Sequence, residues 1–117
     1  MPPLELRIPA DPGALTELRQ AVRSWLHSLG IVEEDVDSIV AACSEVAAGA
    51  IETGPVDVRG ELAGGDVVVR CTGPAGWRID DHSSRWVARL LVDDVLIEPS
   101  SDAVSVVLRK AASRGLR

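Results

Sequence analysis

The stretch "SEVAAGAI", residues 44–51, places one carboxylate, Glu45, among small side chains inside a predicted long helix. Small side chains allow another group to come close to a helix backbone. A carboxylate in such a place can act as a general base that takes a proton from a hydroxyl group or a water molecule. Alternatively, Glu45 is only a surface charge in contact with solvent.

Few other residues in the chain have types that carry catalytic or metal-binding chemistry. Cys43 and Cys71 are too far apart for a metal motif, and Cys43 falls on an apolar helix face, which is typical of a small core residue. His27 and His82 are not paired with a nucleophile, so both are expected at the surface. The sequence therefore predicts no metal site, and reduced thiols are the default in a cytoplasmic protein.

The helix that carries Glu45 is predicted from about residue 33 to about residue 53. Its apolar stripe consists of Val36, Ile39, Val40, Cys43, Val46, Ala47 and Ala50. At about 100° per residue, Glu45 and Gly49 lie away from that stripe, on a second face of mostly small residues. This face is nearly uncharged around Glu45, which is unusual for a helix surface in open solvent.

The other elements follow from hydrophobic periodicity and turn residues. Residues 11–30 predict a helix, with Asp11 as its N-cap, Pro12 in its first turn and Gly30 directly after its end. Further predicted elements are a strand at 4–8, a hairpin at 56–71 that turns at 64–65, a short helix at about 84–92, and strands at 95–98 and 103–110.

The resulting order, β-α-α-β-β-α-β-β, contains consecutive hairpins and therefore predicts a mixed, mostly antiparallel sheet. All helices must cover one face of that sheet to share a core, so the expected fold class is an α/β (α+β) two-layer sandwich. A chain of 117 residues is expected to form a single domain, residues 1–117.

Composition excludes several classes of protein. The formal net charge of −6 argues against binding to nucleic acid, which requires Lys and Arg to replace counterions. No stretch of about 18 apolar residues is present, so no membrane span is predicted, and the N-terminus has no apolar run typical of a signal peptide. The expected location is cytoplasmic.

Three stretches together resemble the RsbW/SpoIIAB-type anti-sigma factor serine kinases, a family of the GHKL superfamily with the histidine-kinase-like ATPase (Bergerat) fold. They are "ELRIPADPGALTELRQAVRSWLHSLGI", "IVAACSEVAAGAI" and "LVDDVLIE" followed by a terminal strand. The family's second helix carries a pattern close to Ser-Glu-x-x-x-Asn-Ala, in which Glu is the general base and Asn holds Mg²⁺. Glu45 matches the base, whereas Gly49 stands in place of Asn and offers no side-chain ligand.

The two other family motifs are also altered. In the Asp-x-Gly-x-Gly motif that binds adenine, Cys71 replaces the Asp, Gly73 matches the first glycine, and Gly76 is one residue late for the second. In the Gly-x-Gly-Leu turn that binds phosphate, the aligned residues 82–85 include Ser84 and no glycine. The segment that corresponds to the ATP lid is shortened to residues 77–84.

The resemblance thus implies a degenerate member of the family: a regulatory protein that binds other proteins and has largely lost its nucleotide site, with no cofactor. The family's partners are a sigma factor and a STAS-domain antagonist (anti-anti-sigma factor), and its kinases form homodimers. One alternative is an ATP-dependent serine/threonine kinase with divergent motifs, in which Glu45 is the catalytic base and ATP and Mg²⁺ are bound. Another is a small-ligand-binding module that reuses the old pocket.

Two features near the altered motifs leave their roles open. Trp77 lies in a glycine-rich segment, where it could be an exposed contact for a partner or could fold down and fill the vacated pocket. Arg78 or Arg85 could hold an anion in place of the lost glycines.

Overall fold

The computed structural model describes residues 3–77 and 82–111, and the side chains of these residues except those of 82–86. The elements are β1 (Leu4–Ile8), α1 (Ala14–Ser28), α2 (Glu33–Ala50), β2 (Val56–Ala63), β3 (Asp66–Pro74), α3 (His82–Leu91), β4 (Asp94–Pro99) and β5 (Ala103–Ala111). This order is the predicted one. No helix in the described part of the chain is long and apolar enough to cross a membrane.

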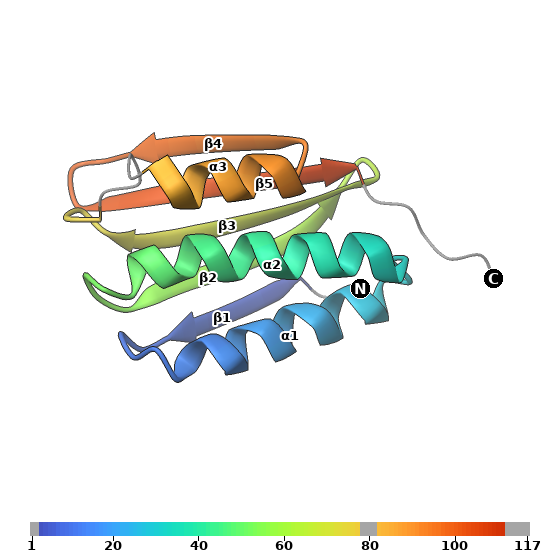
Figure 1. Ribbon diagram of the computed structural model, residues 1–117, viewed down its shortest axis with the longest axis horizontal. Coiled ribbons are helices and arrows are strands. Elements are labelled where there is room, and N and C mark those ends of the chain that lie inside the picture. Colours follow the sequence, from blue (N-terminus) through green and yellow to red (C-terminus); the bar gives the residue numbers. More distant parts are fainter. Residues whose placement is uncertain (1–2, 78–81, 112–117) are drawn as a thin grey trace.

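The five strands form one sheet in the order β1-β2-β3-β5-β4, and each pair of neighbours is antiparallel. The three helices lie together on one face of this sheet (Figure 1). α2 occupies the middle of the helical layer and packs against both α1 and α3. The predicted two-layer α/β (α+β) sandwich is therefore confirmed.

The core lies between the two layers and follows from alternation along the strands. In β2, Val56, Val58 and Gly60 face the helices and are buried, while Arg59 and Glu61 point to the other face and are exposed. Such alternation is what a strand with one covered face requires. β3 and β5 repeat it, so the strands at the centre of the sheet place mostly small or β-branched apolar side chains under the helices.

The helix ends differ from the predictions by a few residues. α1 begins at Ala14, and Asp11 is not its N-cap: the Asp11 carboxylate accepts a hydrogen bond from the Gly13 N–H at 3.2 Å, in a turn that precedes the helix. α2 ends at Ala50 rather than near residue 53. Gly30 does follow the end of α1 with a φ of 76°, the left-handed conformation expected there.

Charged side chains join α1 to α2 on the solvent side. The Arg23 guanidinium lies 2.9 Å from a Glu33 carboxylate oxygen and 2.8 Å from one of Asp37. His27 Nε2 lies 2.9 Å from the other Glu33 oxygen, and Arg19 donates to Ser44 Oγ at 3.0 Å. These contacts are exposed, so they fix the alignment of the two helices more than they stabilise the fold.

Candidate functional site

The predicted site residues on α2 lie where its second face leaves the apolar core. Glu45 is half-buried, and it makes no hydrogen bond or ion pair with the residues that the structure describes. Gly49 follows one helical turn later on the same side of α2 and is also half-buried. The helix therefore presents one carboxylate next to a position without a side chain.

Trp77 fills the space beside that position. Its side chain is only 4% exposed, which favours the filled pocket over an exposed contact. A Cβ atom built on Gly49 would lie 3.5 Å from Trp77 Nε1, and one built on Gly73 of β3 would lie 2.9 Å from Trp77 Cε3 and 3.4 Å from the Ala50 Cβ. We call this space the slot: it is bounded by Gly49 and Ala50 on α2 and by Gly73 on β3.

The indole N–H of Trp77 has no hydrogen-bond partner among the described residues, although it is fully buried. Buried donors are nearly always paired in native proteins, because leaving one unpaired costs about 1–3 kcal/mol. The atom is close to Gly49, which offers no side-chain acceptor. The slot thus accommodates the shape of the indole ring without satisfying its polar atom.

Cys71 lies two residues before Gly73 on β3 and faces the helices, where it is fully buried. Burial raises the pKa of the Cys71 thiol to about 12. Burial also raises the pKa of the Cys43 thiol on α2 well above its ordinary value, with a smaller contribution from the charge of Cys71. Both cysteines are free thiols. Cys71 is therefore a neutral core residue, and it cannot supply the carboxylate acceptor that the adenine motif requires.

The buried thiols predict a loss of stability at high pH. An unfolded thiol ionises near pH 8.5, whereas Cys71 in the folded chain does so only at about 12. The unfolded state therefore loses its proton first, so the contribution of this thiol to the free energy of unfolding should be constant below about pH 8 and fall as the pH rises toward 12. Urea denaturation under reducing conditions at pH 8 and pH 10 measures this, and Cys71→Ala should reduce the fall. An equal fall in that variant would mean that other groups cause it.

The remaining predicted site residues are not brought to the slot. Gly76 is exposed, and a Cβ atom built on it would meet nothing within 4 Å. Ser84 belongs to the backbone of α3, but its side chain and that of Arg85 lie outside the described side chains, and Arg78 lies outside the described residues. Gly49 and Gly73 are thus the two predicted positions that the fold places face to face, with Trp77 between them.

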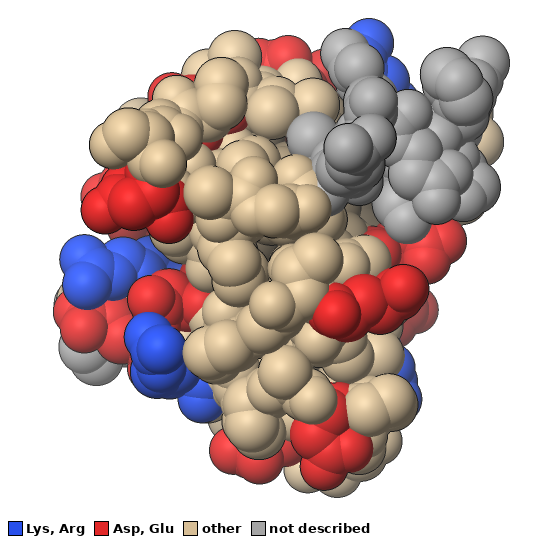
Figure 2. Space-filling view, turned by 90° about the vertical axis from the view of Figure 1, so that its left-hand side faces the viewer, with Lys and Arg blue, Asp and Glu red and all other residues tan. Residues whose placement is uncertain are grey.

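Four connections gather at the end of the molecule near the slot: 9–13, 51–55, 75–77 and 100–102 (Figure 1). Their charged residues are Asp11, Glu52 and Asp102. Figure 2 shows this end with an uncharged centre, and with acidic side chains and a group of Lys and Arg side chains around it. The three charged residues of these connections are therefore all acidic, which is unfavourable for a phosphate-bearing ligand beside them.

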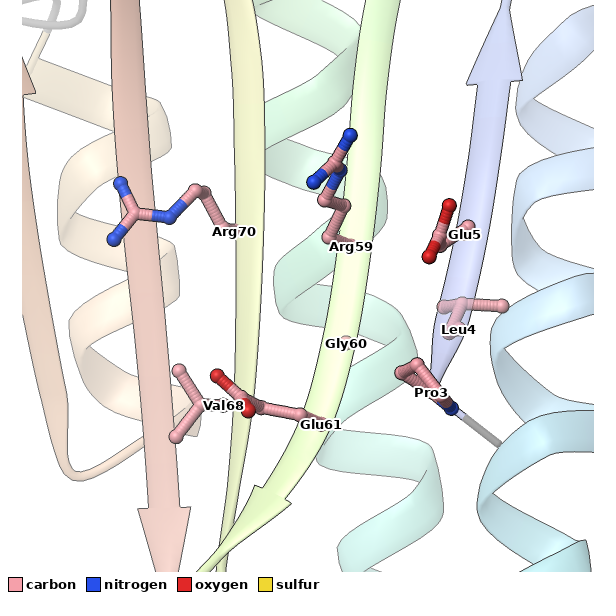
Figure 3. Close-up of a pocket in the computed structure, with 8 residues that line it drawn as sticks. All are labelled: Pro3, Leu4, Glu5, Arg59, Gly60, Glu61, Val68 and Arg70. Carbon is pink, nitrogen blue, oxygen red and sulfur yellow. The ribbon is translucent and has the colours of Figure 1, made fainter. Parts of the chain in front are cut away.

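A separate hollow of about 330 Å³ lies on the sheet face that the helices leave uncovered (Figure 3). Its charged side chains come from three neighbouring strands, and they are Glu5, Arg59, Glu61 and Arg70. Arg70 pairs with Glu98, whereas Arg59 makes no ion pair with a described residue. The two signs are balanced in the hollow, and the sheet separates it from the slot.

The residues around the slot do not fit ATP with Mg²⁺, the ligand that the Bergerat fold implies. A ring already occupies the space between α2 and β3, Gly49 has no oxygen for the metal, and the thiol at the adenine position is buried. Among the described residues, no group of three or more His, Cys, Asp and Glu side chains is arranged to hold a metal ion.

Among solved structures, we compare one that is similar over the whole chain. It is the crystal structure of the RsbU and RsbW domains of Rv1364c from Mycobacterium tuberculosis, with a TM-score of 0.83 and 27% sequence identity. The match covers 100% of this chain and 34% of that one, so the chain spans about a third of that protein. No protein-family model and no curated protein matches the chain. The similarity supports the RsbW-like fold that the sequence resemblance implies.

Proposed function

We propose that this chain is a regulatory protein of the anti-sigma-factor type that acts by binding another protein and has largely lost its nucleotide site. The observation that carries this proposal is the position of Trp77, whose buried indole lies between Gly49 and Gly73. A protein that keeps an RsbW-like fold but fills the slot with its own side chain retains a binding scaffold without the chemistry.

The proposed partner is a sigma factor or a STAS-domain anti-anti-sigma factor in the cytoplasm. We propose that residues 1–117 form a single domain, which can assemble as a homodimer. The similar structure contains an RsbU domain as well as an RsbW domain, so that protein joins an RsbW domain to a second domain. Val87 and Leu90, three residues apart on α3, are exposed by 37% and 75%. Exposed apolar side chains on one side of a helix also suit a protein partner.

Two measurements test the proposal. Millimolar ATP with Mg²⁺ should leave the melting temperature unchanged, because only a ligand that binds the folded state raises it. Purified sigma factors and STAS-domain proteins should include at least one that binds the chain in the absence of nucleotide. A micromolar dissociation constant for Mg-ATP would contradict the loss of the nucleotide site, and it would favour the serine/threonine kinase with divergent motifs.

A substitution at Glu45 distinguishes the proposed binding protein from the kinase alternative. In the proposed protein the carboxylate has no substrate, and it makes no ion pair with a described residue. Glu45→Gln should therefore change the free energy of unfolding by no more than about 0.5 kcal/mol and leave partner binding intact. In the kinase the same substitution would keep the fold and abolish phosphorylation of a STAS-domain serine, because an amide cannot accept the proton. Urea denaturation and a phosphorylation assay distinguish the outcomes.

A further inference from the structure

We propose that the slot is a binding site for a planar two-ring aromatic group, and that Trp77 is its built-in occupant, which leaves and re-enters the slot while the rest of the fold stays intact. This goes beyond the proposed function, which requires only that nucleotide is not bound. Any free aromatic compound that enters the slot must compete with this tethered indole.

The walls of the slot are shaped for a flat ring. The pyrrole edge of the indole faces Gly49 on α2, and its six-membered ring faces Gly73 on β3. Even a single Cβ atom on Gly73 would come within 2.9 Å of the ring. Glycine inside a strand lowers stability relative to alanine, so at Gly73 the chain accepts a cost in β3 and thereby keeps room for the ring.

Trp77 is less well stabilised in the slot than a core side chain whose polar atoms are all hydrogen-bonded. The indole N–H is buried and unpaired among the described residues, while in solvent it would donate to water. Hydrogen bonding therefore favours the ring outside the slot, and apolar burial favours it inside. The balance of these two terms permits an open state that a fully satisfied core side chain would not populate.

The attachment of Trp77 also allows its ring to leave without disrupting an element. Trp77 is part of neither β3 nor α3, and its backbone N–H donates to the Pro74 carbonyl oxygen at 2.9 Å in a turn. The two residues before it, Ala75 and Gly76, are exposed. Withdrawal of the ring therefore requires a local change in one surface turn and leaves the pairing of β3 with β2 and β5 intact.

Hydrogen exchange of the indole N–H groups tests this in the unaltered protein. With ¹⁵N-labelled tryptophan and assignments from Trp→Phe variants, the Trp77 N–H should exchange at least about tenfold faster than the slowest amides of β3. Its rate should not respond to low concentrations of urea, because local opening exposes little surface. Trp25, buried beneath Gly60, is the matched control and should exchange with the slow amides. If the Trp77 N–H exchanges as slowly as the slowest amides, and its rate depends on urea as theirs does, the ring is a static core side chain and the proposal is wrong.

Occupancy by a free ring is tested with indole and the Trp77→Ala variant. At ten times its dissociation constant, indole should raise the melting temperature of that variant by about 5 °C. It should not raise that of the unaltered protein or of Leu18→Ala, whose cavity would lie elsewhere in the core. A folded Trp77→Ala variant that ignores indole would overturn the slot proposal and leave the proposed function standing. If Mg-ATP stabilises Trp77→Ala as well, the slot proposal holds, and the proposed loss of the metal and phosphate contacts is wrong.

Discussion

Replacing Trp77 by alanine should lower the free energy of unfolding by about 3–5 kcal/mol. The side chain is 4% exposed and fills the space between Gly49, Ala50 and Gly73. Two of these residues are glycines and the third is alanine, so none of the three has a side chain that could move into the space that the ring leaves. The cost should therefore combine the lost apolar burial with an uncompensated cavity. Urea denaturation monitored by far-ultraviolet circular dichroism measures it without relying on tryptophan fluorescence.

Trp77→Phe is the matched control because it keeps an aromatic ring and removes the unpaired N–H. The smaller ring loses some contacts, but the buried donor, which costs about 1–3 kcal/mol when unpaired, disappears with it. The two effects oppose each other, so the net loss should be no more than about 1.5 kcal/mol. If Trp77→Phe is as destabilising as Trp77→Ala, the indole N–H has an acceptor in the folded protein, and the imbalance inferred for the slot does not exist.

The fold was predictable because its main signals are local. Val56, Val58 and Gly60 alternate with charged residues along one strand, and the glycine pair at 64–65 sets the turn of the hairpin. Given the order of the elements, the three helices can share one core in few ways, and the simplest is to cover the same face of the sheet. The start of α1 was less predictable, because Asp11 accepts a hydrogen bond in a turn before the helix rather than at its cap.

The arrangement of the site was only partly predictable. The sequence identified Gly49 and Gly73 as altered or retained motif positions, but it could not show that they face each other, since the pairing of α2 with β3 is a tertiary contact. The role of Trp77 stayed open for the same reason. The glycine and alanine that directly precede it are compatible with an exposed contact as well as with a buried ring. The available signal was the coincidence of two side-chain-free motif positions with one large ring.

Alanine substitutions at the two glycines of the slot should change stability in opposite directions. Neither Gly49 nor Gly73 has a positive φ, so alanine can adopt both backbone conformations. Among the described residues outside its own helix backbone, the new Cβ at Gly49 would meet Trp77 Nε1 at 3.5 Å, which is ordinary contact. Gly49→Ala should therefore stabilise the protein by about 0.5–1 kcal/mol, the gain expected when alanine replaces glycine inside a helix.

Gly73→Ala should instead destabilise the protein by about 1–3 kcal/mol, the usual cost of overpacking. Its Cβ would lie 2.9 Å from Trp77 Cε3, and the Ala50 Cβ, 3.4 Å away, limits movement in the other direction. The ring must therefore shift within the slot or leave it, and the second response should appear as increased quenching of Trp77 fluorescence by acrylamide. Urea denaturation of the two variants side by side should thus separate them by about 1.5–4 kcal/mol. A neutral Gly73→Ala variant with unchanged quenching would show that the ring has spare room, and the close fit of the indole between α2 and β3 would then be wrong.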